Sequence, residues 1–188
     1  MFKSTRALTE ISILIALAYV FEIAANTYST WIWAYGGALS ISLVPLALIG
    51  YRHGWVAGFV GGFIMGLLQL LMGAWIVHPA QVLLDFPLPF AMLGLAGLWR
   101  KQVNYGKGWR LYIILSTFVA SALRLACHVL AGYIFWSEGL TGTAAIWSSF
   151  IYNFPYVLGS WILSVILLCI LYKRYVHLFQ PKTYMARR

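Results

Sequence analysis

Few side chains in this sequence could do chemistry, because most of its ionisable residues lie outside the long apolar stretches. The exceptions are Glu10, Glu22, Asp85, Arg124 and His128. An ionisable group within an apolar stretch is costly, so it usually faces a cavity or a partner. A carboxylate accepts hydrogen bonds from an amino-substituted ring, and an imidazole or an amide fixes other polar atoms. Asp85, His128 and Asn153 are therefore the candidate ligand-binding residues.

The same residues allow two other interpretations. Arg124 and His128 stand four residues apart and share one helix face, so Arg124 could pair with Asp85 in a purely structural network. Alternatively, Asp85, Arg124 and His128 could be the acid and base groups of an intramembrane enzyme. The sequence offers that enzyme no convincing nucleophile or metal cluster, so we expect no catalytic residue and no bound metal.

The composition indicates the surroundings of these residues. Of the 188 residues, 62% are hydrophobic and only 9% are charged, and the mean hydropathy is +0.83. A water-soluble domain of this size could not bury so many apolar side chains, so we expect an integral membrane protein. The 17 glycines and the lack of alternating polarity favour packed helices over an outer-membrane barrel. We predict a single all-α membrane domain over residues 1–188.

Six apolar stretches are long enough to be membrane spans, which need roughly 20 residues, or fewer where neighbouring helices shelter them. They lie near residues 8–25, 37–51, 54–73, 79–99, 111–136 and 146–172. The second stretch is short and begins with partly polar residues, which suggests that protein rather than lipid surrounds it.

The basic residues indicate the orientation of these spans. Twelve of the thirteen Lys and Arg residues lie in the N-terminus, the turn at 51–53, the loop at 100–110 and the tail from Lys173. Segments 26–36, 73–78 and 137–145 contain none. Because Lys and Arg accumulate in short cytoplasmic loops, both termini are predicted to be cytoplasmic. The net charge of +9 thus reflects topology, and we expect a lipid membrane and no nucleic acid as its partner.

Three polar residues fall at one depth in this topology. At about 1.5 Å per helical residue, Asp85 and Asn153 lie roughly 9 Å from the outer ends of their spans and His128 roughly 12 Å. Aromatic residues gather near the same outer level, at Trp31, Trp33, Tyr35, Trp75, Phe86, Tyr133, Trp136, Trp147, Tyr152 and Tyr156. Interfacial aromatics alone would need no buried carboxylate, imidazole and amide. We therefore predict a pocket for a small, flat nitrogen heterocycle, which could be cationic.

The third span carries Gly54, Gly58, Gly62 and Gly66 at four-residue spacing, which leaves one bare helix face for a neighbouring backbone. Either another helix of this chain or a partner protein could pack there. The chain has no phosphate-binding Gly-x-x-x-x-Gly-Lys-Ser/Thr loop, so we expect no ATP-driven motor in it.

Four segments resemble a known family. They are residues 36–42, the His-Pro-x-Gln-x-x-Leu-Asp stretch at 78–85 with Phe86, the Arg-x-x-x-His-x-x-x-Gly stretch at 124–132, and residues 152–156. In this order they resemble the thiamine-specific substrate-binding subunit of energy-coupling factor transporters, the ThiT family. The resemblance implies a six-helix, multi-pass protein of a prokaryotic plasma membrane that captures thiamine from outside with high affinity.

The resemblance also implies partners and roles for single residues. Asp85 would accept hydrogen bonds from the aminopyrimidine and Trp136 would stack on the ligand, with His128 and Asn153 beside it. Further expected binding positions are Trp33, Tyr35, Phe86, Gly132, Trp147, Ser148 and Tyr152. Phe86 replaces a frequent tyrosine, and Trp147 or Ser148 stands where the family has a binding tyrosine, so thiamine, its phosphates and its pyrimidine half all remain possible ligands.

Transport in this family implies other subunits. A transmembrane scaffold and two cytoplasmic ATPases would drive uptake, so this chain would need no cofactor and ATP would be used by its partners. The face of span one that would meet the scaffold is imperfect here, with Ser12 and Ala16 at four-residue spacing. A carrier that works alone is the rival expectation.

Overall fold

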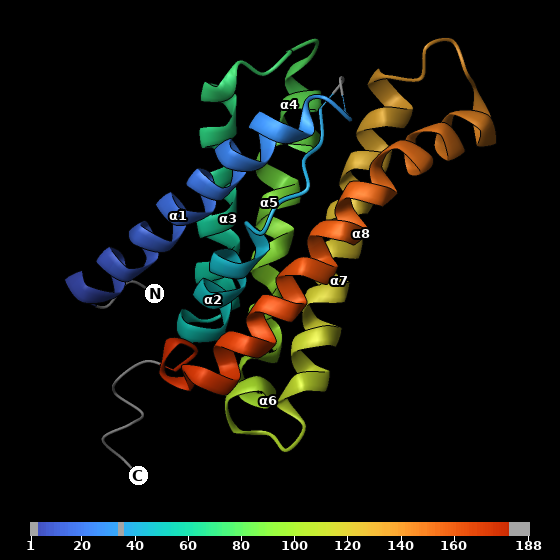
Figure 1. The fold of residues 1–188 in the computed structure, drawn as a ribbon. Helices are drawn as coiled ribbons and strands as arrows, with labels where there is room; N and C mark the ends of the chain where they lie inside the picture. Colours follow the sequence, from blue (N-terminus) through green and yellow to red (C-terminus); the bar gives the residue numbers. More distant parts are fainter. Residues whose placement is uncertain (1–3, 34–35, 181–188) are drawn as a thin grey trace.

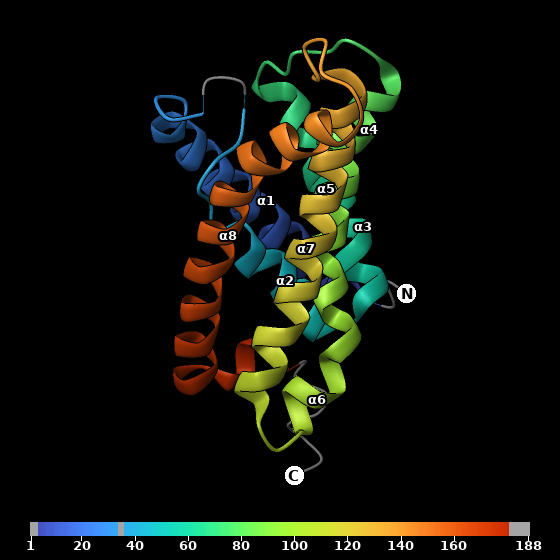
Figure 2. The same ribbon diagram turned by 90° about the vertical axis from the view of Figure 1, so that its right-hand side faces the viewer.

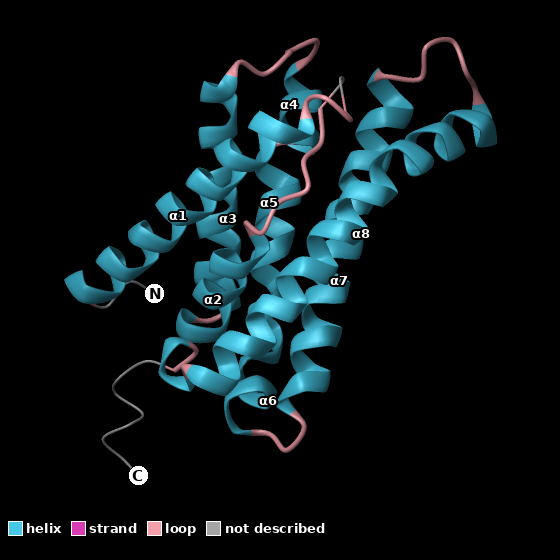
Figure 3. Cartoon of the chain, viewed as in Figure 1, coloured by secondary structure: helices cyan, strands magenta, loops and turns pink. Residues whose placement is uncertain are grey.

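The computed structural model describes residues 4–33 and 36–180, which form helices and connecting loops and contain no strand (Figures 1 and 3). The helices are α1 (Thr5–Ser29), α2 (Leu43–His53), α3 (Trp55–Gln69), α4 (Pro79–Asp85), α5 (Pro87–Gly94), α6 (Arg100–Tyr105), α7 (Trp109–Phe135) and α8 (Gly142–Arg174). Short 3-10 turns lie at Leu70–Met72, Leu95–Trp99 and Val176–Leu178. The loops around residues 73–78 and 137–141 lie at one end of the bundle, here called the α4 end, and α6 lies at the other (Figures 1 and 2).

Five helical runs in the described part of the chain are long and apolar enough to cross a membrane. They are Thr5–Ser29, Trp55–Met72, Pro79–Tyr105, Trp109–Phe135 and Gly142–Arg174. The remaining expected span, 37–51, is the second along the chain and is shorter as a helix than predicted. Its helical part, α2, has only 11 residues and follows an extended segment. Residues 43–51 are all buried, which confirms that protein surrounds this short helix.

The extended segment before α2 is held by side-chain hydroxyls. The Leu39 N–H donates to Ser29 Oγ on α1 at 3.1 Å, and the Ser40 N–H donates to Ser160 Oγ on α8 at 2.9 Å. Ser160 in turn donates to the Ala38 carbonyl at 3.2 Å, and the Tyr28 hydroxyl donates to the Leu39 carbonyl. Non-helical backbone at membrane depth needs such partners, because lipid offers none.

The expected span 79–99 is a broken helix. Phe86, between α4 and α5, has φ −119° and ψ −83°, and Pro87 begins α5. A proline cannot donate a backbone hydrogen bond and its ring clashes with the preceding turn, so the helix is interrupted just before it. The interruption makes Asp85 the last residue of α4, at the α4 end of the bundle.

The glycine ladder of the third span packs inside the chain. A Cβ atom added to Gly58, Gly62 or Gly66 would lie within 3.0 Å of backbone atoms of α5 or of the break that precedes it, around Gly94, Phe90 and Phe86 respectively. The close contact between α3 and α5 confirms the internal-packing alternative for these three residues. Gly54 serves a different purpose, since its φ of +100° forms the turn between α2 and α3.

An arginine joins three segments at the α6 end. Arg52 donates from Nε to Glu10 Oε2 at 2.7 Å and from Nη2 to Glu10 Oε1 at 3.0 Å, a bidentate pair between α2 and α1. Its Nη1 donates to the carbonyls of His177 and Gln180, both at 2.7 Å, in the segment after α8. Bidentate, charge-assisted bonds of this kind are the strong ones in proteins.

We expect Arg52→Met to lower the free energy of unfolding by about 1–3 kcal/mol, because two carbonyls lose their donor and the Glu10 carboxylate loses two of its hydrogen bonds. Thermal unfolding in detergent measures this. The matched control is Arg6→Met: Arg6 pairs with the same Glu10 carboxylate at 3.0 Å, but its side chain is 57% exposed against 12% for Arg52. An exposed pair contributes about 0–1 kcal/mol, so equal losses in both variants would contradict the prediction.

Candidate functional site

Side chains from α4, α7 and α8 meet near the α4 end and form what we call the polar cluster: Asp85, His128, Asn153 and Tyr156. Asp85 Oδ1 lies 3.8 Å from His128 Nδ1. The His128 ring meets the Tyr156 ring edge to face, with centroids 6.1 Å apart. The Tyr156 hydroxyl donates to Asn153 Oδ1. The three residues singled out from the sequence are thus linked through Tyr156.

One oxygen of the Asp85 carboxylate is well supplied with donors. Oδ2 accepts from Gln81 Nε2 at 2.7 Å and from Trp136 Nε1 at 3.3 Å. Gln81 is buried one helical turn before Asp85, and its own Oε1 accepts from the Val77 N–H at 3.4 Å. Sequence reasoning did not assign Gln81 to the site, although it stands in the His-Pro-x-Gln segment. These bonds orient Asp85 so that Oδ1 faces His128.

The imidazole of His128 is oriented by Arg124, one turn earlier on α7. Arg124 Nε donates to His128 Nε2 at 3.4 Å. Since Nε2 accepts, Nδ1 is the ring nitrogen that faces Asp85 and can donate a hydrogen bond there. The structural-network alternative pairs Arg124 with Asp85, and the structure does not show this pair. Arg124 forms an ion pair with Glu22 of α1, with Nη2 and Oε1 3.6 Å apart.

Asn153 is fixed where α7 and α8 approach most closely. Its Nδ2 donates to the Ser149 carbonyl at 2.8 Å, and Ser149 Oγ donates to the Val129 carbonyl of α7 at 3.2 Å. A Cβ on Gly132 would lie 2.7 Å from the Ser149 Cβ. Gly132 therefore allows the two helices to meet beside the cluster. Pro155 lies within α8 just after Asn153, and the first turns of α8 run at an angle to the rest (Figure 1).

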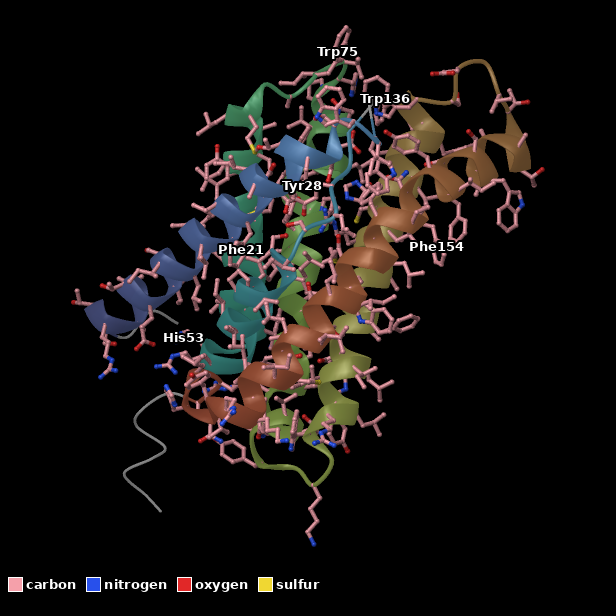
Figure 4. The ribbon with its side chains drawn as sticks, viewed as in Figure 1. Phe21, Tyr28, His53, Trp75, Trp136 and Phe154 are labelled. Carbon is pink, nitrogen blue, oxygen red and sulfur yellow. The ribbon has the colours of Figure 1, made fainter. Side chains whose placement is uncertain are left out.

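Three of the expected aromatic site residues lie close to the polar cluster or beside it in the chain. Trp33 packs edge to face on Tyr156 with centroids 5.8 Å apart, and Trp136 lies beside the α4 end of the bundle (Figure 4). Phe86 is partly buried at the break between α4 and α5. Trp33 and Trp136 thus contact members of the polar cluster, and Phe86 directly follows Asp85 in the chain.

Two other expected site residues have partners outside the polar cluster. Trp147 and Ser148 are both exposed, and Trp147 packs on Phe150 instead. The Tyr152 hydroxyl donates to the Gly36 carbonyl at 2.8 Å, so it contacts the loop after α1. Tyr35 lies outside the described residues.

A groove on another face of the bundle has different chemistry. It lies between α7 and α8, and its lining atoms are almost all apolar. The lining residues are Phe118, Ser121, Ala122, Leu125, Phe154, Val157, Leu158 and Trp161. Figure 4 shows Phe154 directed away from the bundle. This groove cannot supply the several hydrogen bonds that a polar ligand needs.

The polar cluster carries groups that can bind a polar ligand. Within the described residues, no group of three or more His, Cys, Asp and Glu side chains could hold a metal ion. The cluster offers a carboxylate, an imidazole, an amide and several ring faces, which together suit a heterocycle that donates hydrogen bonds and carries positive charge.

Comparisons with known proteins agree over most of the chain. Residues 8–180 match the family described as thiamine transporter protein (Thia_YuaJ). The thiamine transporter ThiT of Bacillus subtilis (strain 168) is 33% identical over 178 residues, covering 90% of this chain and 92% of the relative. The thiamine transporter ThiT of Lacticaseibacillus paracasei is 26% identical over 155 residues, 77% of each chain. A solved structure of ThiT from Listeria monocytogenes aligns with a TM-score of 0.76 and 27% identity, covering 93% of this chain and 97% of that one.

Proposed function

Because the chain belongs to the thiamine transporter protein family, we propose that it binds thiamine in the polar cluster of Asp85, His128, Asn153 and Tyr156. Thiamine joins an aminopyrimidine, which donates hydrogen bonds, to a thiazolium ring with a permanent positive charge. The observation that carries the proposal is the meeting of Asp85 and His128 at 3.8 Å beside the aromatic rings of Tyr156 and Trp33.

Each part of the ligand has a matching group in the cluster. Asp85 Oδ1 accepts from the aminopyrimidine, because Oδ2 already accepts from Gln81 and Trp136. Trp136 stacks on the ligand, and the faces of Trp33 and Tyr156 surround the thiazolium, an arrangement that stabilises cations. His128 and Asn153 complete the polar contacts. Phosphorylated thiamine and the free pyrimidine half are the alternative ligands.

The charge distribution supports capture from outside the cell. Basic residues lie at the α6 end, at Arg52, Arg100, Lys101, Lys107 and Arg110, and this end is cytoplasmic in our topology. The polar cluster near the α4 end then faces the exterior. The protein is a multi-pass membrane protein, as its apolar helices indicate.

Uptake in our proposal requires partner subunits. The sequence contains no phosphate-binding loop for ATP. In our proposal the chain needs no cofactor of its own, because a transmembrane scaffold with two cytoplasmic ATPases supplies the driving force. Ser12, Ala16 and Val20 form an exposed face of α1 that a scaffold helix could cover. Thiamine accumulation in vesicles that contain this chain alone would instead support a carrier that works by itself.

Asp85→Asn tests the assignment of the carboxylate. We expect it to weaken thiamine binding by about 1.5–3 kcal/mol, because a charge-assisted hydrogen bond is lost. Isothermal titration of the purified protein with thiamine, thiamine phosphates and an aminopyrimidine measures this and ranks the ligands. Glu138→Gln is the control, since it removes an exposed carboxylate from a loop at the same end. Equal affinity of Asp85→Asn and wild type would remove Asp85 from the site.

The enzyme alternative has little support, because the relatives are named transporters. Mass spectrometry of the ligand released after prolonged incubation distinguishes the two classes. Our proposal expects intact thiamine, whereas an altered ligand would indicate a reaction.

A further inference from the structure

Glu22 is a buried acidic residue for which the proposed binding mode gives no purpose. It lies on α1 with 3% of its surface exposed, and its ion-pair partner Arg124 on α7 is 5% exposed. The guanidinium group of Arg124 also lies 4.7 Å over the ring of Phe90, which packs behind it. A full positive charge and a full negative charge are thus enclosed beside the polar cluster.

This pair is poorly built for stability. Its closest atoms, Arg124 Nη2 and Glu22 Oε1, are 3.6 Å apart, which is an ion pair without a hydrogen bond. The second carboxylate oxygen, Glu22 Oε2, is buried and has no hydrogen-bond partner among the described residues. Removing two charges from water is costly, and a buried pair repays that cost only with good geometry and full hydrogen bonding. The pair therefore calls for another explanation.

The pair is connected to the polar cluster through His128. Arg124 contacts Glu22 through Nη2 and His128 through Nε, and His128 faces Asp85. The formal charges of Glu22, Asp85 and Arg124 add up to −1. Without Glu22 they would add up to zero, because the positive charge of Arg124 would then offset the charge of Asp85 that attracts a cationic ligand.

We propose that Glu22 sets the charge selectivity of the binding site by cancelling Arg124, which leaves the charge of Asp85 free to favour a singly positive ligand. This inference rests on the proposed thiamine function. It assigns Glu22 an electrostatic role rather than a contact with the ligand. The expected signature is therefore a change in preference between ligands of the same shape and different charge.

The test compares thiamine with deazathiamine, an analogue of similar shape in which a neutral ring replaces the thiazolium. The readout is the ratio of the two dissociation constants, measured by isothermal titration on purified protein. We expect Glu22→Gln to reduce the preference for thiamine by about 10- to 30-fold, the effect of one charge about 10 Å away at an effective dielectric constant of about 20. Binding of deazathiamine should change by less than about 3-fold, because a neutral ring has no Coulomb term.

Substitutions of Arg124, the ion-pair partner of Glu22, separate the charge effect from a general loss of stability. Arg124→Gln should shift the ratio the opposite way, toward thiamine, and the double variant Glu22→Gln/Arg124→Gln should return it close to the wild-type value. Because the ratio cancels any general damage to the site, disturbance of His128 in the Arg124 variants does not obscure it. Glu10→Gln is the matched control, on the same helix and about 18 Å further along its axis, and should leave the ratio unchanged.

Two outcomes overturn the inference while leaving the thiamine function intact. Glu22→Gln could weaken both ligands equally, which would make the pair a structural link between α1 and α7. Alternatively, Arg124→Gln could leave the ratio unchanged or lower it. If wild-type protein binds neither ligand, the proposed function itself fails, and that result is distinct from both.

Discussion

Trp136→Ala is expected to weaken thiamine binding by about 3 kcal/mol, roughly 100-fold, and to be at least as damaging as Asp85→Asn. The indole has two roles in our proposal. Its ring stacks on the ligand, and its Nε1 donates to Asp85 Oδ2 at 3.3 Å, which holds the carboxylate in place. Isothermal titration with thiamine gives the affinity, and Trp136→Phe separates the roles because it retains a ring and removes the N–H donor.

Trp75→Ala is the matched control for this substitution. Trp75 lies at the same end of the bundle but stands clear of it, with 79% of its surface exposed against 43% for Trp136 (Figure 4). An interfacial tryptophan should contribute little to ligand affinity, so we expect a change below about 2-fold. Comparable losses of thiamine affinity in Trp136→Ala and Trp75→Ala would contradict the prediction. They would indicate that tryptophans at this end anchor the protein in the membrane and that Trp136 does not bind thiamine directly.

Gly62→Ala is expected to lower the free energy of unfolding by about 3 kcal/mol, at the upper end of the range for overpacking. An added Cβ would meet the Phe90 carbonyl and the Ala91 Cα, and these are backbone atoms that cannot rotate away. Helices α3 and α5 would have to separate along their whole contact. The thermal unfolding midpoint in detergent, followed by circular dichroism, measures the loss.

The adjacent residue provides the comparison. A Cβ on Gly61 would lie 3.1 Å from Ile49 Cδ1, the flexible end of a side chain, so Gly61→Ala should stay within about 1 kcal/mol of wild type. Both substitutions add one methyl group to the same helix. If Gly62→Ala unfolds at the temperature of Gly61→Ala, backbone contact between α3 and α5 does not limit stability.

The sequence predicted the features that follow from composition and local spacing. Apolar length and the four basic segments indicated a helical membrane bundle, because membrane insertion depends on those two properties. Depth counted along the helices brought Asp85, His128 and Asn153 to one level, and the structure links them through Tyr156. Four-residue glycine spacing indicated a close helix contact without identifying the partner helix.

Features that depend on how helices cross could not be predicted. A pair between Arg124 and Asp85 was one of the alternatives that the sequence left open, but the path of α1 across the bundle brings Glu22 to Arg124 instead. The break at Phe86 was missed because the apolar stretch continues through it, although Pro87 was a visible signal. Gln81 carries no charge and was not predicted to be a site residue, although it stands in the His-Pro-x-Gln segment. It makes the shorter of the two hydrogen bonds to Asp85 Oδ2.

The hydroxyl-bound segment before α2 has a consequence for biosynthesis. The Ser40 N–H donates to Ser160 Oγ and the Ala38 carbonyl accepts from the same hydroxyl, so both depend on a residue at least 120 positions later in the chain. The ribosome synthesises the segment before α2 earlier than α8. Until α8 has been inserted, the backbone groups of that segment are hydrated or bonded to other partners. The final hydrogen bonds of the segment before α2 therefore form only after residue 160 has been synthesised and inserted.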